Sequence, residues 1–507
     1  MLSKSKFLKG MQCPKMLWLE KRKKEVFQPD TDFLQKAQNG QEVGQLAREL
    51  FPGGREIVFN PENMAGMAKH TKELIDQGVK TIYEATFVLE GIFVMVDILE
   101  IDSDGVVLNE VKSSTSAFKD TKAQPPKEEY LWDLGIQYYV LTGLDYNIKG
   151  AFLICLNNAY IRKGALELEK LFAKNDFLEF VKDFQSEIPE HLATINKALE
   201  NPQEPNTDIG AHCDNPYPCD AKVYCWQEQR GIVGQDHVFA IARLGFNKKM
   251  QFYKSGRVFF KDLNQGDVQT LNIKQRLQVT HTLSHESHID AKALRQFLER
   301  LRHPLCYLDF ETVQLAIPPF SNTKPYGKIP FQYSIHIDSG EGKLEHREFL
   351  ADCGTDGRLE LAQSLVRDIP KGACVLAYNA VFETSVLQEL ANSFTAQHPK
   401  IAQSLLQIKE GIVDLMEPFQ QKHYYTPQMG GSYSIKSVLP ALVPDFESAY
   451  KNLELVHNGE EAMAAYAKMP HMSRAKQEKY KQALLAYCKL DTLAMVKVLE
   501  KLREVVE

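Results

Sequence analysis

The sequence has no long apolar run and no tract of low complexity. None of its apolar stretches reaches the roughly 18 consecutive residues that a membrane-spanning helix requires. The first residues are rich in lysine and lack the apolar block of a secretory signal. We therefore expect a cytoplasmic protein without a membrane partner. The lack of biased tracts also argues against a disordered, collagen-like or coiled-coil chain.

The chain also lacks a net positive charge. Its 60 lysines and arginines are outnumbered by 66 aspartates and glutamates, which gives a formal net charge of −6. The molecule as a whole therefore has no basic field that would indicate a polyanionic partner. Residues 1–24 are the exception, because they carry a cluster of basic side chains and a single acid, Glu20. Such a segment is typical of a phosphate contact or of a solvated helix face, and charge alone does not distinguish the two.

The remaining composition is that of a folded globular protein, with 44% apolar and 25% charged residues. Strand-like runs alternate with helical patterns in both halves, so we expect an α/β architecture throughout. The patterns predict strands at 82–89, 91–101, 106–111, 150–156, 305–310, 331–337 and 373–378, and helices at 128–143, 290–302, 357–368, 381–393 and 477–503. We assign domains to residues 1–228 and 295–507, joined by a connecting region at 229–294.

Three short motifs of the C-terminal half carry acidic residues where chemistry could use them. Asp309 and Glu311 alternate along an apolar strand, so both side chains are expected on one face. Two adjacent carboxylates repel each other there unless a cation neutralises them. Glu383 falls in the first turn of a predicted helix, and Tyr487 and Asp491 share one face of a later helix. Taken singly, each motif also fits an exposed strand end, helix-start chemistry or amphipathic packing.

In this order the motifs resemble the DEDD exonucleases of the DnaQ-like superfamily, which have a ribonuclease H-like fold. The Tyr-x-x-x-Asp form of the last motif is similar to the tyrosine branch of that superfamily. The resemblance implies a 3′→5′ exonuclease in which four carboxylates hold two Mg²⁺ or Mn²⁺ ions and Tyr487 orients the attacking water. The implied ligands are Asp309, Glu311, Glu383 and Asp491. Most of the superfamily has an aspartate where this chain has Glu383, and Asp414 is the alternative ligand.

Two longer sequence segments indicate a more specific family. Residues 330–336 and 431–440 are similar to a bacterial family of unknown function, over a match that covers 295–507. That family joins an exonuclease-like domain to an N-terminal RecB-like nuclease domain. Lys436, inside the second segment, is a candidate phosphate contact, although a surface lysine is an equally good interpretation.

In the N-terminal half, a predicted strand pair brings Asp97, Glu110 and Lys112 together. A hairpin that turns about residues 103–104 places Asp97 opposite Glu110, and alternation puts Glu110 and Lys112 on one face. Two carboxylates and an ammonium suit one divalent ion and a lysine that stabilises the attacking hydroxide or the phosphate. A cross-strand ion cluster is the simpler alternative.

The order of these elements resembles the PD-(D/E)xK nuclease fold. An entry helix at 40–50 precedes Asp97, the Glu110-x-Lys112 motif, and a helix that carries Gln137. In RecB-like members of this fold, a glutamine-to-tyrosine motif on that helix supports the site. The resemblance therefore implies catalytic roles for all four side chains and at least one Mg²⁺ or Mn²⁺ ion held by Asp97 and Glu110.

Two positions depart from the RecB-like pattern. Leu141 stands where the tyrosine is expected, and Gly44 stands where many relatives carry a metal-binding histidine, a role that Glu42 could take over. These departures keep open a second interpretation, in which the N-terminal domain is inactive and acts as a nucleic-acid-binding scaffold.

The nine cysteines are unevenly distributed, and in a cytoplasmic chain thiols or metal ligands are expected before disulfides. Five are scattered through apolar or helical context and are interpreted as buried packing residues: Cys155, Cys306, Cys353, Cys374 and Cys488. The other four are Cys13, Cys213, Cys219 and Cys225. Their one-before, three-after arrangement resembles the iron–sulfur RecB-like nucleases, such as the CRISPR-adaptation nucleases and AddB.

That resemblance implies a [4Fe–4S] cluster that links the two ends of the domain, and zinc is the alternative because four thiolates also suit it. The usual tail spacing in these relatives is Cys-x2-Cys-x5-Cys, whereas here both gaps contain five residues. His212 is expected beside the ligands or facing solvent.

Together the resemblances imply an enzyme with two nuclease sites that hydrolyses phosphodiester bonds. Single-stranded DNA or DNA ends are the expected substrate, by analogy with the iron–sulfur relatives. The alternatives are an RNA exonuclease, since DEDD domains act on either polymer, and the scaffold described above.

Overall fold

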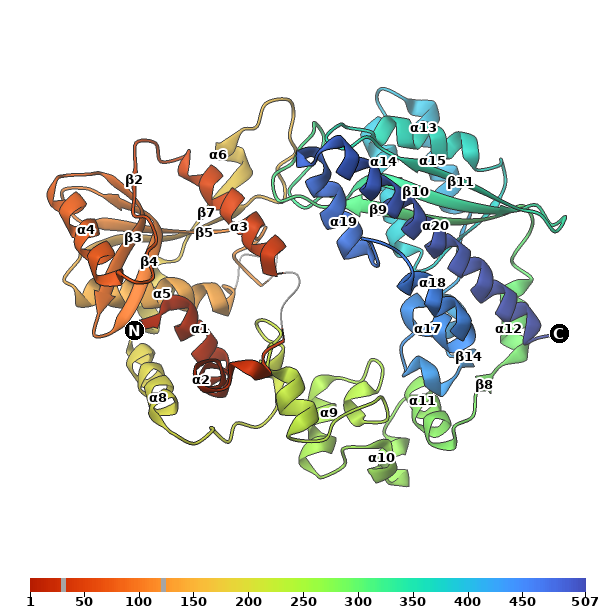
Figure 1. Ribbon diagram of the computed structural model, residues 1–507, viewed down its shortest axis with the longest axis horizontal. Helices are drawn as coiled ribbons and strands as arrows, with labels where there is room; N and C mark the ends of the chain where they lie inside the picture. The colour runs from red at the N-terminus through yellow and green to blue at the C-terminus, as the bar shows by residue number, and fades with distance from the viewer. Residues whose placement is uncertain (29–32, 120–124) are drawn as a thin grey trace. The chain divides into compact units, whose positions relative to one another are not determined.

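The computed structural model describes residues 1–28, 33–119 and 125–507. It divides into two units, each of which mixes helices with a mixed sheet, so the expected α/β class is present in both (Figure 1). Unit 1 contains Met1–Ile232 and Leu315–Gly327, and unit 2 contains Val233–Gln314 and Lys328–Glu507. The region assigned from sequence as a connection therefore groups with unit 2 from Val233 onward.

The sheet of unit 1 has seven strands, in the order β2-β3-β4-β5-β6-β7 with β1 paired to β4. The strands are β1 (Leu2–Ser3), β2 (Arg55–Glu56), β3 (Thr81–Leu89), β4 (Ile92–Ile101), β5 (Val106–Lys112), β6 (Ile148–Leu156) and β7 (Phe172–Asp176). Strands β3, β4 and β5 form an antiparallel meander, and β6 lies parallel to β5. The β4–β5 hairpin pairs Ile98 with Asn109 and Ile101 with Val106, which is the predicted register.

Helices cover both faces of this sheet. They are α1 (Lys4–Gln12), α2 (Pro14–Arg22), α3 (Phe33–Arg48), α4 (Met64–Asp76), α5 (Glu128–Gly143), α6 (Leu168–Leu171), α7 (Leu178–Asp183) and α8 (Ile188–Glu200). Helices α1, α5 and α8 share a core with Leu99 of β4, whereas α3 packs against its neighbour Ile98. Because successive strand residues point to opposite faces, these helices lie on opposite sides of the sheet.

The main sheet of unit 2 has five strands in the order β11-β10-β9-β12-β13. Its strands are β9 (Leu305–Val313), β10 (Ile329–Asp338), β11 (Leu344–Leu350), β12 (Cys374–Ala377) and β13 (Ile412–Asp414). Strands β9, β10 and β11 are antiparallel neighbours, whereas β12 and β13 run parallel to β9. The sequence predicted β9, β10 and β12 and missed β11 and β13.

Two layers of helices enclose this sheet. They include α12 (Ala291–Leu298), α13 (Arg358–Asp368), α14 (Val381–Phe394), α15 (Pro399–Glu410), α16 (Glu417–Gln420), α17 (Ile435–Leu442), α18 (Glu447–Lys451), α19 (Gly459–Lys468) and α20 (Arg474–Glu504). Helix α20 packs on one face, where Leu499 joins Leu305 and Tyr307 in one core. Helices α13–α15 pack on the other face, against Cys306 and Leu308.

The first part of unit 2 has a small core of its own. Its helices are α9 (Phe246–Lys254), α10 (Gln265–Gln269) and α11 (Ile273–Ser284), and Phe252, Phe260 and Val279 are buried among them. A short strand β8 (His288–Ile289) pairs with β14 (Tyr424–Tyr425). We call the part of unit 2 that α9–α11 form the subdomain. The β8–β14 pairing attaches the subdomain to the segment that follows α16.

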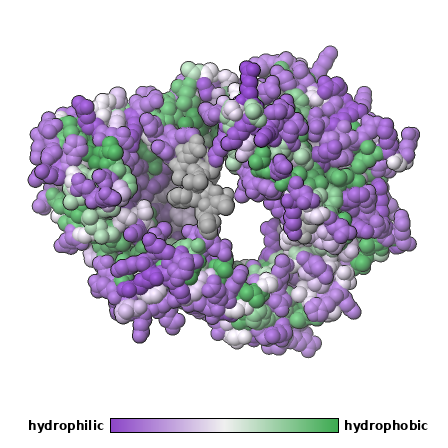
Figure 2. All heavy atoms as spheres, viewed as in Figure 1, coloured by the Kyte–Doolittle hydropathy of each residue, from purple (hydrophilic) through white to green (hydrophobic). Residues whose placement is uncertain are grey.

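Hydrophilic side chains cover most of the face seen in Figure 2, and apolar residues appear there in separate groups. Among the described residues, no helix has both the length and the apolar character needed to cross a membrane.

Candidate functional site

Three of the predicted acidic residues meet in unit 2: Asp309 and Glu311 on β9, and Asp491 on α20. Their carboxylate oxygens all lie within 4.8 Å of one another. Alternation along β9 directs both strand residues to the face that α20 covers. Within residues 1–28, 33–119 and 125–507, this is the one group of three or more His, Cys, Asp or Glu side chains with such close ligand atoms. A divalent cation is the natural partner for oxygens so arranged.

Glu383 joins this group electrostatically. It lies in the first turn of α14, its side chain is buried, and its charge acts on both Asp309 and Glu311. Among the described residues, its Oε2 atom is buried without a hydrogen-bond partner. A buried carboxylate oxygen with no donor is costly unless a cation reaches it. Asp414, the alternative ligand, instead accepts backbone N–H groups of Asn379 (3.0 Å) and Met416 (2.9 Å).

Two tyrosines hold Asp491 in place. Tyr487 lies one turn earlier on α20, on the same face as the spacing predicted, and it hydrogen-bonds to Asp491. The hydroxyl of Tyr450 donates to the Oδ1 atom of Asp491 at 2.6 Å. Burial, followed by the neighbouring carboxylates, raises the pKa of both tyrosine hydroxyls, so both remain protonated donors. Sequence analysis missed Tyr450 because it lies on α18, without any fixed spacing from the acidic motifs.

The carboxylates of this group cannot all be ionised easily in the absence of a cation. Removal from water and the charge of Asp491 raise the pKa of Asp309 well above its usual range. Burial and the neighbouring carboxylates do the same for Glu311, while Lys436 opposes the shift. The pKa of Asp491 is raised by burial to about 6, although its two tyrosine donors and Lys436 lower it.

In unit 1, the four predicted residues of the N-terminal motif also lie together. The Lys112 ammonium is 2.7 Å from Glu110 Oε1, and the Gln137 amide donates to Glu110 Oε2 at 2.8 Å. Asp97 accepts the backbone N–H of Val111 at 2.7 Å. The predicted hairpin register explains this proximity, because it places Asp97 opposite Glu110, next to the Ile98–Asn109 pair.

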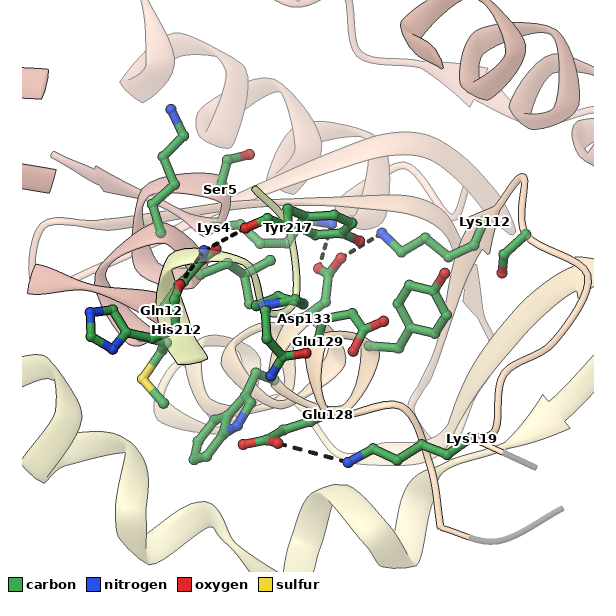
Figure 3. Close-up of a pocket in the computed structure, with 18 of the residues that line it drawn as sticks. Lys4, Ser5, Gln12, Lys112, Lys119, Glu128, Glu129, Asp133, His212 and Tyr217 are labelled. Carbon is green, nitrogen blue, oxygen red and sulfur yellow. Dashed lines mark hydrogen bonds and ion pairs between the residues drawn. The ribbon is translucent and has the colours of Figure 1, made fainter. Parts of the chain in front are cut away.

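Two further charged residues, which the sequence did not single out, complete this cluster (Figure 3). Lys4 of α1 lies 2.8 Å from Glu110 and 2.9 Å from Asp133, and Lys112 lies 2.5 Å from Asp133. Burial alone would raise the pKa of Asp133, but the two ammonium groups hold it below its usual range. Asp133 is four residues before Gln137 on α5, a spacing that could have identified it, whereas Lys4 is brought in only by the pairing of β1 with β4.

This cluster forms one wall of a pocket of about 870 Å³. Besides Lys4, Lys112 and Asp133, the pocket is lined by Tyr130 and Tyr217, of which Tyr217 is labelled in Figure 3. The two lysines already neutralise much of the local negative charge. The N-terminal cluster therefore differs from the acidic group of unit 2, whose three close ligand atoms, among the described residues, are all carboxylate oxygens.

The four predicted cysteine ligands line one small pocket of unit 1. Cys13 ends α1, and the other three come from the segment after α8: Cys213, Cys219 and Cys225. All are free thiols, and the backbone N–H of Cys219 donates to the carbonyl of Cys213 at 2.9 Å. Hydrogen bonds with Cys13 and Cys213 raise the pKa of His212 to about 10. His212 thus lies beside the thiols, which is one of the two positions expected for it.

Comparison with known proteins gives partial matches. The model of the family described as "Domain of unknown function (DUF2779)" matches residues 306–434. The chain is 26% identical over 167 residues to uncharacterized protein UU173 of Ureaplasma parvum serovar 3, which covers 31% of this chain and 24% of the relative. It is 23% identical over 225 residues to uncharacterized protein MG366 of Mycoplasma genitalium, which covers 41% of this chain and 33% of the relative. The chain thus spans about a quarter to a third of these relatives, and no solved structure matches it.

The raised carboxylate pKa values predict that metal-free protein loses stability as the pH rises. Between the unfolded value of Asp491, near 3.8, and its folded value of about 6, the folded state binds more protons than the unfolded state. Stability therefore falls through this window, by about 1.4 kcal/mol for each pH unit per such carboxylate. Thermal melts in EDTA from about pH 4 to about pH 8 measure this loss, and added Mn²⁺ should reverse it most at the high end.

Asp309→Asn should flatten this pH dependence, because it removes one member of the crowded group. Asp352→Asn, at an exposed aspartate that follows β11, is the matched control and should leave the profile as it is. An identical profile for Asp309→Asn would mean that the carboxylates do not interact in solution.

The contacts of Lys4 predict a large effect of Lys4→Met. Removing this ammonium leaves Glu110 and Asp133 with one cation in place of two, so the free energy of unfolding should fall by about 3 kcal/mol. Lys9→Met on the same helix breaks only the exposed pair with Glu20 and should cost less than about 1 kcal/mol. Urea unfolding of the two variants compares these costs, and equal losses would show that the Lys4 contacts are absent in solution.

Proposed function

We propose that the chain is a metal-dependent nuclease that hydrolyses phosphodiester bonds of single-stranded DNA or DNA ends. Its C-terminal unit would be a 3′→5′ exonuclease of the tyrosine DEDD type, with a ribonuclease H-like fold. The observation that carries the proposal is the convergence of Asp309, Glu311 and Asp491 within 4.8 Å, with the unpaired Oε2 of Glu383 nearby. These are hard oxygen ligands, which is the donor set that Mg²⁺ and Mn²⁺ prefer.

The topology of unit 2 supports the same assignment. Three consecutive antiparallel strands are followed by two that run parallel to the first and are reached through helices. This is the arrangement expected of a ribonuclease H-like domain. It places the acidic pair of β9 at the centre of the sheet and Glu383 just after the carboxyl end of the neighbouring β12.

The residues of the site have separable roles in this proposal. Asp309, Glu311, Glu383 and Asp491 would hold the divalent ions, which when bound supply a Lewis acid and lower the pKa of water. Tyr487 and Tyr450, both donating to Asp491, fix the orientation of that carboxylate. The Tyr487 hydroxyl would also orient the attacking water. Lys436 contributes positive charge toward Glu311 and Asp491, on the side where a substrate phosphate would enter.

For unit 1 we propose a RecB-like PD-(D/E)xK domain. The meander β3-β4-β5, followed by α5 and the parallel strand β6, supports this fold, as does the proximity of Asp97, Glu110, Lys112 and Gln137. A second nuclease site is the direct implication. The contacts of Lys4 with Glu110 and Asp133 favour the alternative, a scaffold that binds the strand without cutting it, because an ammonium stands where a metal ion would be held.

We also propose that Cys13, Cys213, Cys219 and Cys225 bind a [4Fe–4S] cluster, with zinc as the alternative. Four thiols that line one pocket are a complete ligand set for either group. The cluster would join α1 to the segment after α8 and would thereby fix the helix that carries Lys4. It is assigned a structural role here and no part in hydrolysis.

Cleavage of end-labelled single strands tests the nuclease proposal. We expect 3′-end trimming of DNA with Mg²⁺ or Mn²⁺, and a loss of about 100-fold or more in Asp309→Asn. Asp338→Asn, the same change on the neighbouring strand, should retain full activity. Lys112→Ala asks whether unit 1 cuts, because a separate cut that disappears in this variant would assign activity to it.

Other outcomes decide between the alternatives. RNA cut in preference to DNA would make the protein an RNA exonuclease. Strand binding lost without any change in cleavage in Lys112→Ala would make unit 1 a scaffold. Cleavage that survives in the double variant Asp309→Asn/Lys112→Ala would remove both assignments.

Metal analysis of protein purified without oxygen tests the cysteine site. A cluster predicts about four iron atoms per chain with matching sulfide and visible absorption. Cys213→Ser should lose the iron and lower the thermal midpoint, while the half-buried Cys353→Ser should change neither. About one zinc per chain would select the zinc alternative, and protein free of both metals would exclude the site.

A further inference from the structure

A groove of about 720 Å³ lies in unit 2 beside the acidic group. One wall comes from residues 240–243, which include Arg243, and from Lys249 of α9. The other comes from the loop that leads into α17, including Tyr433 and Lys436. Tyr378 and Asn379, which follow β12, form the end near Glu383. The groove is therefore lined by three cations and an accessible aromatic ring.

The two walls are held together by specific contacts. The Arg243 guanidinium donates to the Tyr433 hydroxyl at 2.9 Å and lies 5.7 Å from the centre of its ring. Gly431 has a φ of +80°, and a Cβ at this position would stand 2.1 Å from the side chain of Gln278 on α11. The subdomain thus fits closely against a loop that has no room for a side chain. Its packing fixes Arg243 over Tyr433.

Lys436 connects this groove to the acidic group. Its charge acts on both Glu311 and Asp491, so its ammonium lies within electrostatic reach of the carboxylates. Its side chain is exposed, as is that of Arg243. Lys249 is half-buried and donates to the carbonyl of Phe239 at 2.7 Å, which fixes its position at the groove. Positive charge is therefore present from the subdomain to the edge of the acidic group.

We infer that this groove binds the single strand of DNA that enters the acidic site, with Arg243, Lys249 and Lys436 against its phosphates and Tyr433 against a base. A positively charged groove with an aromatic face is the usual way in which proteins hold single strands without reading their sequence. The inference rests on the proposed function. It gives the subdomain formed by α9–α11 a role, because that subdomain supplies two of the three cations.

Equilibrium binding of a fluorescein-labelled 12-nucleotide oligo(dT) to the full chain in EDTA tests the inference without requiring cleavage. The double variant Arg243→Ala/Lys249→Ala should bind about tenfold more weakly, and the slope of log affinity against log salt should fall by roughly two. Lys254→Ala/Lys261→Ala removes two exposed lysines of the same subdomain outside the groove, and it should bind as the unchanged chain does. Tyr433→Leu should also weaken binding about tenfold while leaving the salt slope nearly as it was.

The thermal midpoints of all variants are measured beside the affinities, and Arg243→Gln replaces the double variant if that one does not fold. Equal losses in the groove and control variants, or unchanged affinity in both groove variants, would overturn the inference. So would equal loss for a blunt duplex of the same length, since a duplex offers no free base face to Tyr433. If cleavage depends on Asp309 but the groove variants bind normally, the proposed function stands and the groove assignment fails. If the groove variants lose binding but no strand is ever cut, the groove assignment stands and the proposed nuclease function fails.

Discussion

The crowding of four carboxylates around the centre of one sheet is the constraint on which unit 2 depends. Asp309 and Glu311 face α20 because strand residues alternate, and that helix must supply Asp491 to the same place. Their like charges and their removal from water oppose ionisation, as the raised pKa values of the group express. The donors around it stabilise the negative charge only in part. Tyr450 donates to Asp491 and the Cys488 thiol donates to Asp309 Oδ2 at 3.5 Å, whereas Glu383 Oε2 has no hydrogen-bond partner among the described residues. The fold therefore maintains a local arrangement that is unfavourable until a cation is bound, which is typical of a functional site and not of structural packing.

Unit 1 also buries carboxylates close together, but there lysine side chains pair with them. Glu110 and Asp133 are as deeply buried as the acids of unit 2, but Lys4 and Lys112 lie within hydrogen-bond distance of them. Charges that are already paired and hydrogen-bonded have little to gain from a metal ion, unless one of the lysines moves away. Helix α1 determines whether Lys4 remains, and that helix ends at Cys13, one of the four thiols of the cysteine pocket. A group bound at the cysteines, as proposed, would thus be linked to the charge balance at Glu110 through a single nine-residue helix.

The sequence predicted those features that depend on local periodicity. The turn at 103–104 determined the β4–β5 register, and with it the proximity of Asp97 to the residues around Glu110. Two further features depend on short spacings within one element, and the structure reproduces both. They are the strand alternation of Asp309 and Glu311 and the helical spacing of Tyr487 and Asp491. Strand β13 was missed because it is short, and β11 was missed because it is largely exposed and polar. Strand β7 was also missed. Lys4 and Tyr450 were missed for another reason: each meets its partner only after elements far apart in the sequence have packed together.

Net charge is a poor guide to where a polyanion would bind, because folding brings together charged residues that lie far apart in the sequence. The chain carries a net charge of −6, yet Arg243, Lys249 and Lys436 line one groove although almost 200 residues separate the first from the last. Folding gathers these cations because the subdomain of α9–α11 packs against the loop before α17, at a position where Gly431 leaves no space for a side chain. Acidic residues elsewhere on the surface lower the total without cancelling this local field, because screening limits their reach to about 10 Å. What would matter for a phosphate entering the site is the charge within that distance, and beside the carboxylates of Asp491 and its neighbours Lys436 contributes positive charge.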